Sequence, residues 1–550
     1  MRPHCLRTAC SRELDGYDDA VGRYEGSVGE EPESPSGISR RKVLTTGAAA
    51  AIVGAGVGAA GVALLGSPSR GPNLWTRPNQ SGAQPVGGLH LQFGKDASTG
   101  VVVSWHTTDA VRNPRVMVGT PTSGFGRVVQ AETRTYRDAK SKTEVRVNHA
   151  RLDNLAPDTV YIYAAVHDGT NPELGTVRTA PSGRNPFRFT SFGDQSTPTL
   201  DQLKKTSYRS DNLGSPASGD TTTAIERLGP LFNLVNGDLC YANLAHDRIR
   251  SWSDWFDNNT RSARYRPWMP AAGNHENELG NGPVGYAAYQ TYFALPDSGS
   301  DTELRGLWYS FTAGSVRVIS LSNDDVCFQD AGNFYVHGYS GGAQKRWLET
   351  ELAGARADSR VDWVVVCMHQ TAISTADRTN GADLGIRQEW LPLFDRYQVD
   401  LVVCGHEHHY ERSHPVRGAQ DTETKTPIPV ETRADVIDTS KGTVHLVIGG
   451  GGTSNPTNTM FFPEPKCRVL TSVGQIDPAI GHKAPFYVVE GAPWSAFRDR
   501  QNPYGFVAFD VDPGSPGGNT SMKATHYAVN GPYAAISVVE EFTLTRPRRG

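Results

Sequence analysis

The stretch 399-VDLVVCGHEH-408 joins the pattern of a buried β-strand to two histidines. Leu401, Val402 and Val403 form a continuous apolar run, which is typical of a strand covered on both faces. His406 and His408 follow this run almost at once. If the chain stays extended there, both side chains leave it on the same side. The stretch predicts either a polar loop whose histidines have no special role or a pair of metal ligands at a strand end.

Four other apolar runs end in residues of the same chemical kind. In open α/β sheets, ligands bind at the carboxyl ends of the strands. Any one of these ends alone is typical of a turn, a loop cap or a core histidine, but together they predict a metal centre at one sheet edge. The runs are FRFTSFGD, ending at Asp194; LFNLVNGDLCY, with Asp238 and Tyr241; RPWMPAAGNHE, with Asn274, His275 and Glu276; and VDWVVVCMH, ending at His369.

The donor atoms of these side chains indicate which cations they suit. They are carboxylate and amide oxygens, imidazole nitrogens and a phenol, without a thiolate. This set is larger than one tetrahedral zinc site requires. It suits two hard or borderline cations with one carboxylate bridging them. Two cations about 3.5–4 Å apart form a known clamp for in-line displacement at phosphorus.

The chain divides into two folded regions of different pattern. Residues 85–181 show short alternating strands, which predict an all-β sandwich. From about residue 187, apolar runs alternate with helical patterns such as 342–355 and 386–398, which predicts an α/β architecture. The tail from YGFVAFDV to ISVVEEFTLT returns to strands, and we expect it to close a sheet edge.

The order of the motifs resembles that of the purple acid phosphatases, in the calcineurin-like metallophosphoesterase superfamily. The motifs are GD (193–194), GDxxY (237–241), GNHE (273–276), VxxH (366–369) and GHxH (405–408). Trp105, the turn 155-LAPDT-159, Tyr161 and Tyr163 resemble a fibronectin type III module, as found before the catalytic domain in plant-type members.

These resemblances imply a fold and a domain order. The fold is an α/β metallophosphoesterase sandwich, with two mixed β-sheets flanked by helices, preceded by an all-β fibronectin type III-like sandwich. The expected domains are a disordered N-terminal extension (1–38), a twin-arginine signal or anchor (39–70), the fibronectin type III-like domain (85–181) and the catalytic domain (187–545).

The resemblance also implies a role for each site residue. The first metal, Fe(III), has Asp194, Tyr241 and His408 as ligands. The second, Fe(II), Zn(II) or Mn(II), has Asn274, His369 and His406. Asp238 bridges the two. The catalytic residues are His275, which contacts the phosphate or protonates the leaving group, and Glu276, which supports it. A metal-bound hydroxide would attack phosphorus in line.

Two departures from the family pattern affect what can be carried over. Gln195 and Ser196 follow Asp194, where the family has x-Gly, and 374-STADRTNGAD-383 lacks the histidine pair of the plant enzymes. The substrate preference and the pH optimum therefore do not carry over. Arg378 is a candidate phosphate contact. His409 stays open between a surface residue and a substrate contact.

We expect an exported phosphatase that hydrolyses phosphate monoesters, with acid phosphatase activity. A phosphodiesterase or nucleotide hydrolase on the same centre is the alternative enzyme. A cell-envelope binding protein with a vestigial metal domain is the alternative outside enzymes. Small phosphate esters are the expected partners. The net charge of −4 gives no basic field, so nucleic acid is not expected. Homodimer formation stays open.

The N-terminal region resembles a twin-arginine export signal. Arg40 and Arg41 precede an Ala/Gly-rich apolar stretch that runs to about Leu65. We expect a secreted or cell-envelope protein, with membrane anchoring by an uncleaved signal as the alternative. The seven cysteines show no CxxC pair, so no disulfide framework is expected, and Cys367 and Cys404 are expected to be buried free thiols.

Overall fold

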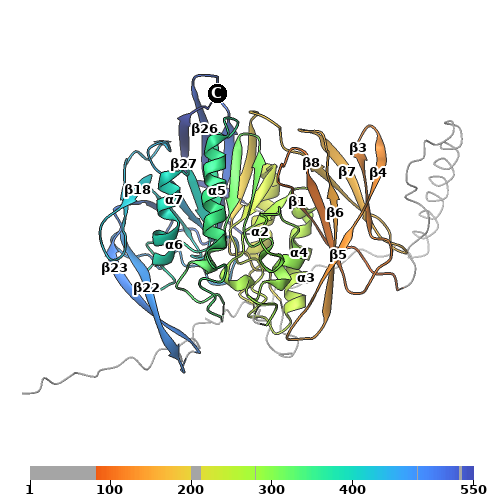
Figure 1. Cartoon of the computed structure of the whole chain (residues 1–550), viewed down its shortest axis with the longest axis horizontal. Helices are drawn as coiled ribbons and strands as arrows, with labels where there is room; N and C mark the ends of the chain where they lie inside the picture. The colour runs from red at the N-terminus through yellow and green to blue at the C-terminus, as the bar shows by residue number, and fades with distance from the viewer. Residues whose placement is uncertain are drawn as a thin grey trace, which may run out of the picture. The chain divides into compact units, whose positions relative to one another are not determined.

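The computed structural model describes residues 82–199, 212–278, 280–332, 334–479, 481–531 and 535–549 (Figure 1). The predicted N-terminal extension and export signal lie outside these residues. In the described parts of the chain, no helix has the length and apolarity needed to cross a bilayer.

The first domain is the predicted all-β sandwich. Trp105 and Tyr163 are fully buried in its core. The Tyr161 hydroxyl accepts a hydrogen bond from the Ala156 backbone N at 2.8 Å, which fastens the turn before that strand. One sheet has the order β1 (Gly87–Phe93), β2 (Val101–Thr107), β6 (Glu144–Leu152), β5 (Glu132–Arg137); the other is β4 (Gly124–Gln130), β3 (Arg115–Thr120), β7 (Val160–Val166), β8 (Glu173–Arg178).

The second domain contains two seven-stranded mixed sheets, as expected. The first has the order β11 (Trp268–Pro270), β10 (Phe232–Val235), β9 (Phe187–Phe192), β25 (Gly505–Asp512), β26 (Asn519–Val529), β27 (Ile536–Pro547), β20 (Val436–Asp438). The second has the order β12 (Tyr309–Ala313), β13 (Val316–Ser320), β14 (Trp363–Cys367), β16 (Leu401–Cys404), β21 (Val444–Ile448), β17 (Tyr410–Ser413), β24 (Ser495–Arg498).

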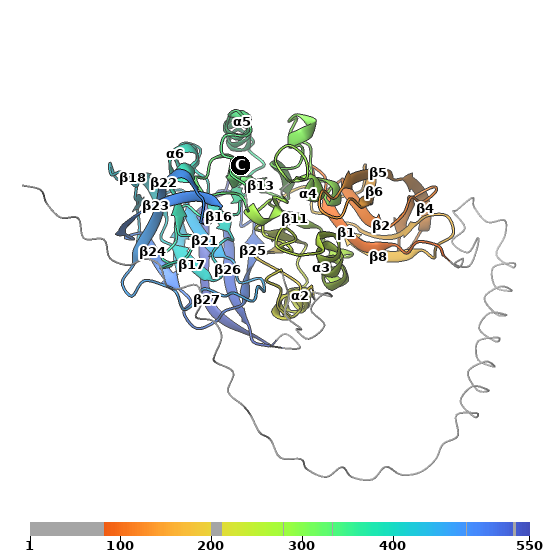
Figure 2. The same ribbon diagram turned by 90° about the horizontal axis from the view of Figure 1, so that it is seen from below.

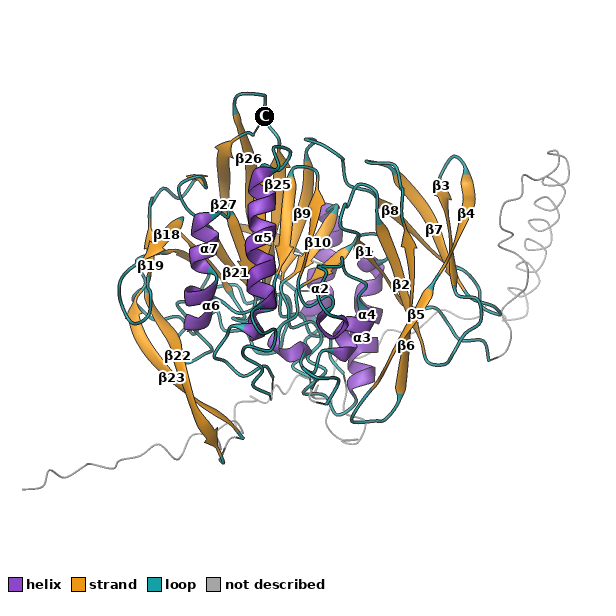
Figure 3. Ribbon diagram, viewed as in Figure 1, coloured by secondary structure: helices purple, strands orange, loops and turns teal. Residues whose placement is uncertain are grey.

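Alternate residues of the central strands pack against different layers. In β14, Val365 and Cys367 belong to the core that also contains Phe189 and Phe509 of the first sheet. Val364 and Val366 instead belong to the core formed with helices α5 (Ala343–Ala357), α6 (Leu384–Glu389) and α7 (Leu391–Arg396). Figure 3 shows these three helices in purple. The continuous valine run of β14 follows from this burial on both faces.

The helical patterns of the sequence are confirmed in one segment and divided in the other. The pattern over 342–355 is α5. The pattern over 386–398 is two short helices, α6 and α7, which meet at Trp390. Pro392 lies in the first turn of α7, where its missing N–H is tolerated, and it could not continue the ladder of α6.

The C-terminal strands do more than close an edge. β25 pairs with β9 and so places the Asp194 strand inside its sheet, while β20 forms the edge beyond β27. The remaining strands form a ribbon, β18 (Val416–Ala419) with β19 (Pro427–Pro429), and a three-stranded sheet, β15 (Ala382–Asp383), β22 (Lys466–Asp477) and β23 (His482–Gly491).

The two domains share one continuous core. Helix α3 (Arg248–Ala263) lies beside β1 of the sandwich (Figure 2). The Tyr163 hydroxyl donates to the Arg264 carbonyl at 2.7 Å, and Arg248 pairs with the buried Asp138 at 2.5 Å. The other helices are α2 (Ala217–Leu228) and α4 (Ala287–Tyr292), with 3₁₀ turns at Asn274–Glu276, Thr302–Leu304 and Asn323–Asp325.

Candidate metal centre

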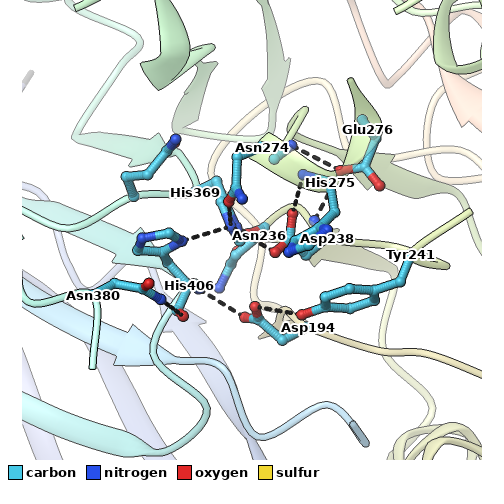
Figure 4. A network of polar contacts seen from close by, with 12 residues as sticks. Asp194, Asn236, Asp238, Tyr241, Asn274, His275, Glu276, His369, Asn380 and His406 are labelled. Atoms are coloured by element: carbon cyan, nitrogen blue, oxygen red, sulfur yellow. Dashed lines mark hydrogen bonds and ion pairs between the residues drawn. The ribbon is translucent and has the colours of Figure 1, made fainter. Parts of the chain in front are cut away.

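The loops that follow five strands bring all seven predicted ligands into one buried site. Figure 4 labels six of these ligands, all except His408. These strands belong to both sheets, so the site lies where the carboxyl ends of the two sheets meet. The contributions are Asp194 after β9, Asp238 and Tyr241 after β10, Asn274 after β11, His369 after β14, and His406 and His408 after β16.

The residues predicted to hold the second metal lie in direct contact. His369 Nε2 is 3.0 Å from Asp238 Oδ2, 3.0 Å from Asn274 Oδ1 and 3.2 Å from His406 Nδ1. One ligand atom each of Asp238, His369 and His406 lies within 4.8 Å of the others, and all three residues are buried. The first-metal residues form a second cluster, in which the Tyr241 hydroxyl is 3.2 Å from Asp194 Oδ1 and 3.0 Å from His408 Nε2.

Each of the three histidines is oriented from behind by an oxygen that accepts a hydrogen bond from its outer nitrogen. His369 Nδ1 donates to the Asn236 carbonyl at 2.7 Å and His408 Nδ1 to the Asn455 carbonyl at 2.6 Å. His406 Nε2 donates to Gln329 Oε1 at 2.5 Å. Each outer nitrogen therefore carries a proton, and a ring that gives up its second proton when a cation binds presents a lone pair on its inner nitrogen. This is the arrangement of metal-ligating histidines, so the residues present fit a bound cation.

The charges of the cluster residues also fit a bound metal cation. Burial lowers the pKa of His369, but the neighbouring Asp238 carboxylate outweighs it and raises this pKa to about 10. Burial also lowers the pKa of His406, which lies against His369. The buried carboxylate thus favours a positive charge in its surroundings, while His406 keeps a neutral ring able to ligate. A metal cation supplies positive charge without protonating the second ring.

A ring of side-chain amides closes around His406. Gln329 Nε2 donates to Asn380 Oδ1 at 3.2 Å, and Asn380 Nδ2 donates to the His406 carbonyl at 3.1 Å. With the bond from His406 to Gln329, these contacts fix both the ring and the backbone of this residue. Sequence reasoning missed Gln329 and Asn380 because neither belongs to a motif.

The ligand loops adopt a backbone conformation that most residues avoid. Four of the predicted ligands have positive φ angles, namely Asp194 (58°), Asp238 (53°), Tyr241 (54°) and His406 (74°). Such a conformation costs about 1–2 kcal/mol for each non-glycine residue. It persists only because the surrounding contacts enforce it, as is common at functional sites.

Glycines of the motifs allow the loops to approach one another. A Cβ atom at Gly273 would lie 2.3 Å from Asp238 Oδ1, and one at Gly405 would lie 2.4 Å from Asp194 Oδ2. Both distances are far below van der Waals contact. The glycine of GNHE and that of GHxH are therefore required by the packing of the carboxylates.

The two predicted catalytic residues have different positions. Glu276 is buried and accepts backbone N–H bonds from Asp238, Leu239 and Gly273, each at 2.8 Å. It holds the loops after β10 and β11 together and acts on the site through the backbone. His275 is half-buried beside Tyr241, with 4.4 Å between ring centroids. Its Nδ1 lies 3.0 Å from Asn243 Oδ1, a contact that sequence reasoning did not foresee.

His409 is not the surface residue that was one of its two alternatives. It is buried, its Nε2 pairs with Glu411 at 3.1 Å and its Nδ1 lies 2.8 Å from Thr457 Oγ1. Arg378 has a side chain that is 89% exposed, 3.6 Å from Asp377. No contact with the predicted ligands is seen for Arg378 among the described residues, so the structure does not bring it to the cluster.

The unusual residue after Asp194 has a packing role. Gln195 is buried, and its Nε2 donates to the Ser218 carbonyl at 3.2 Å and to Thr222 Oγ1 at 2.9 Å. Asn259 donates to its Oε1 at 2.9 Å. Gln195 thus anchors the loop after β9 to α2 and α3. The five cysteines of the described chain, Cys240, Cys327, Cys367, Cys404 and Cys467, are free and buried, which confirms the interpretation of Cys367 and Cys404.

Two segments of the chain match known protein families. Residues 86–182 match the purple acid phosphatase N-terminal domain, and residues 216–410 match the calcineurin-like phosphoesterase domain. An uncharacterized protein of Mycobacterium tuberculosis is 75% identical over 516 residues, covering 94% of this chain and 97% of that protein.

Plant phosphatases are more distant relatives. The purple acid phosphatase of Glycine max is 28% identical, over 69% of this chain and 75% of its own length. The Fe(3+)-Zn(2+) purple acid phosphatase 12 of Arabidopsis thaliana is 26% identical, over 69% and 74%. A solved purple acid phosphatase from yellow lupin seeds shares the fold, with a TM-score of 0.60 and 21% identity over 85% of this chain and 76% of that one. The matched domains, these relatives and the shared fold show that the chain belongs to the purple acid phosphatase family and is a metal-dependent hydrolase of phosphoric esters.

Proposed function

We propose that this protein is an exported phosphatase that hydrolyses phosphate monoesters at a two-metal centre. The observation that carries the proposal is the set of three histidines that each give their outer N–H to an oxygen. Their inner nitrogens face Asp194, Asp238, Tyr241 and Asn274. A buried group of lone pairs with so few protons suits cations better than any arrangement of hydrogen bonds.

We assign the first metal, Fe(III), to Asp194, Tyr241 and His408, and the second, a divalent Fe, Zn or Mn ion, to Asn274, His369 and His406, with Asp238 shared. Two cations bound there would supply Lewis-acid stabilisation of charge on the phosphoryl oxygens. The Arabidopsis thaliana relative, an Fe(3+)-Zn(2+) purple acid phosphatase, supports this pairing. Burial and Asp194 raise the pKa of the Tyr241 phenol well above its ordinary value, so a phenolate there requires a strong cation.

His275 is the residue placed to move a proton. Asn243 Oδ1 accepts a hydrogen bond from Nδ1 of its ring, and the ring packs on Tyr241. This leaves Nε2 as the atom able to reach a substrate. A proton on Nε2 can pass to the leaving alkoxide as the ester bond breaks. Asn243 keeps the ring oriented for that transfer.

Export rests on the sequence of residues 39–66, where Arg40 and Arg41 precede an apolar stretch. The twin-arginine route carries folded proteins, which suits a protein that acquires its metals before export.

The test of the function combines metal analysis with paired substrates. Purified protein should contain two metal ions per chain and hydrolyse phenyl phosphate much faster than diphenyl phosphate. A preference for the diester would favour the phosphodiesterase alternative. Two bound metals without hydrolysis of either ester would favour a binding protein. Asp238→Ala should lose both metals and all hydrolysis, because its carboxylate serves both ions; normal turnover of this variant would contradict the assignment.

A further inference from the structure

A hollow of about 230 Å³ opens between the hairpin β22–β23 and the loop segment that contains Gln329, Asp330 and Gly332. Figure 1 shows the hairpin as a long arm at the lower left. The lining includes Gln329, Asp330, Leu470, Val473, Lys483 and Tyr487. Gln329 also accepts the hydrogen bond from His406. The hollow therefore begins one side chain away from a proposed metal ligand.

The loop that carries Gln329 is held firmly in place. Asp383 Oδ2 accepts the backbone N–H groups of Phe328 and Gln329 at 2.9 and 3.1 Å. The rings of Phe328, His337 and Tyr335 stack in succession, with centroid distances of 5.3 and 5.8 Å. The loop thus presents the Gln329 side chain to the hollow and places the ring of Tyr335 against Lys483, which lines it.

Lys483 is positioned by this loop without a carboxylate partner. Its Nζ lies 4.0 Å from the centroid of the Tyr335 ring, which orients the ammonium by a cation–π contact. The nearby Asp330 carboxylate has two other partners. Its Oδ2 accepts the Lys483 backbone N–H at 3.2 Å and lies 3.4 Å from His482 Nδ1. Among the described residues, no carboxylate oxygen lies within 4.0 Å of Lys483 Nζ.

The rest of the wall is largely apolar, with Tyr487 beside the aliphatic side chains. Leu470, Val473 and Pro485 line one side. Arg468 does not line the hollow itself but lies 3.7 Å from the ring centroid of Tyr487, which does, and donates to the Thr379 carbonyl at 3.2 Å. An organic group with a ring or short chain and a negative charge is complementary to these surroundings.

We propose that the hollow binds the alcohol part of the substrate and that Lys483 recognises a second anionic group on it. This inference rests on the proposed phosphatase function and narrows its substrate class. The preferred substrates are phosphate monoesters whose alcohol carries a carboxylate or a second phosphate. The hairpin supplies the Lys483 ammonium to a site that lacks the histidine pair of the plant enzymes.

The experiment compares three esters on four forms of the metal-loaded protein. The esters are phenyl phosphate, 4-carboxyphenyl phosphate and 1,4-phenylene bisphosphate, so a second carboxylate is distinguished from a second phosphate. The proteins are the wild type, Lys483→Gln, Lys483→Arg and the control Lys466→Gln, which changes an exposed lysine at the start of the same hairpin.

The wild type should prefer at least one doubly anionic ester over phenyl phosphate. Lys483→Gln should lower kcat/KM for that ester about fivefold more than for phenyl phosphate, mainly through KM, as expected for one partly solvated ion pair. Lys483→Arg should retain most of the preference, and Lys466→Gln should not change it. An unchanged ratio of kcat/KM values in Lys483→Gln would overturn the subsite alone. Failure of the wild type to hydrolyse any of the esters would overturn the proposed function itself.

Discussion

Replacing Gln329 by leucine removes the acceptor that orients His406. The Gln329 Oε1 atom accepts from His406 Nε2 at 2.5 Å, and the Gln329 amide also donates to Asn380 at 3.2 Å. Leucine is similar in size but has no polar atom. Without the acceptor, the proton of His406 gains by moving to Nδ1, where His369 Nε2 lies 3.2 Å away as an alternative acceptor. The ring would then present its protonated nitrogen to the second metal.

The magnitude follows from the group that is left without a partner. An unsatisfied buried donor costs about 1–3 kcal/mol. Removing an outer hydrogen-bond partner of a metal-ligating histidine typically costs about 10–100-fold in metal affinity. Tenfold corresponds to about 1.4 kcal/mol, so the two ranges agree. We therefore expect Gln329→Leu to weaken the second metal site 10–100-fold and to leave the Fe(III) site unchanged.

The assay is competition with a chelator of known affinity, following the release of each metal from the loaded protein by elemental analysis. Gln290→Leu is the matched control, because the Gln290 amide is bonded only to the Glu303 and Arg305 carbonyls on an exposed surface in the described structure. The reasoning is refuted if Gln329→Leu retains the second metal with wild-type affinity. It is equally refuted if both metals weaken alike, since that would indicate general loss of structure.

Two further predictions concern export and stability. Replacing Arg40 and Arg41 with lysine should keep phosphatase activity inside the cell and remove it from the envelope and medium; undiminished export would exclude the twin-arginine route. Burial raises the pKa of Glu278 from its ordinary value near 4.5 to about 7, although Trp252 and Arg248 lie against it. The folded state then binds the additional proton between these pH values, so this group's contribution to stability is lost as the pH rises from about 4.5 to 7. Denaturant unfolding at several pH values should show a smaller decline for Glu278→Gln than for the wild type, and an identical decline in both would contradict the assignment.

The ligand cluster could be foreseen because each ligand lies within a few residues of a strand with a clear apolar pattern. The carboxyl ends of parallel strands meet at one edge, so five local patterns predict one site. Gln329, Asn243 and Asn455 could not be foreseen in this way. They reach the site from loops without periodicity, and Gln329 contacts His406 across 77 residues of sequence. Such contacts depend on tertiary packing, which a local pattern does not contain.

The same distinction applies to the fold. Strands β14 and β16 are buried on both faces, so they can be predicted from their continuous apolar runs. Helix α5 can be predicted from the spacing of its core-facing residues. The hairpin β22–β23 has few buried residues, all of them in β22, so its sequence lacks a strong apolar alternation. The division between α6 and α7 depends on Pro392, whose position near a helix start can be seen only once the helix ends are known. The positive φ angles of the ligand residues likewise follow from packing between loops.

The colour of the iron-loaded protein tests the metal centre most directly. The Tyr241 hydroxyl lies 3.2 Å from Asp194 Oδ1 and 3.0 Å from His408 Nε2, where a shared Fe(III) would take it as phenolate. The purified wild type should then show a visible phenolate-to-iron charge-transfer band. Tyr241→Phe should lose the band while keeping its fold and much of its metal, and the control Tyr289→Phe, whose hydroxyl instead donates to the Pro270 carbonyl, should keep it. A colourless iron-loaded wild type, or a band that persists in Tyr241→Phe, would contradict the Fe(III) site.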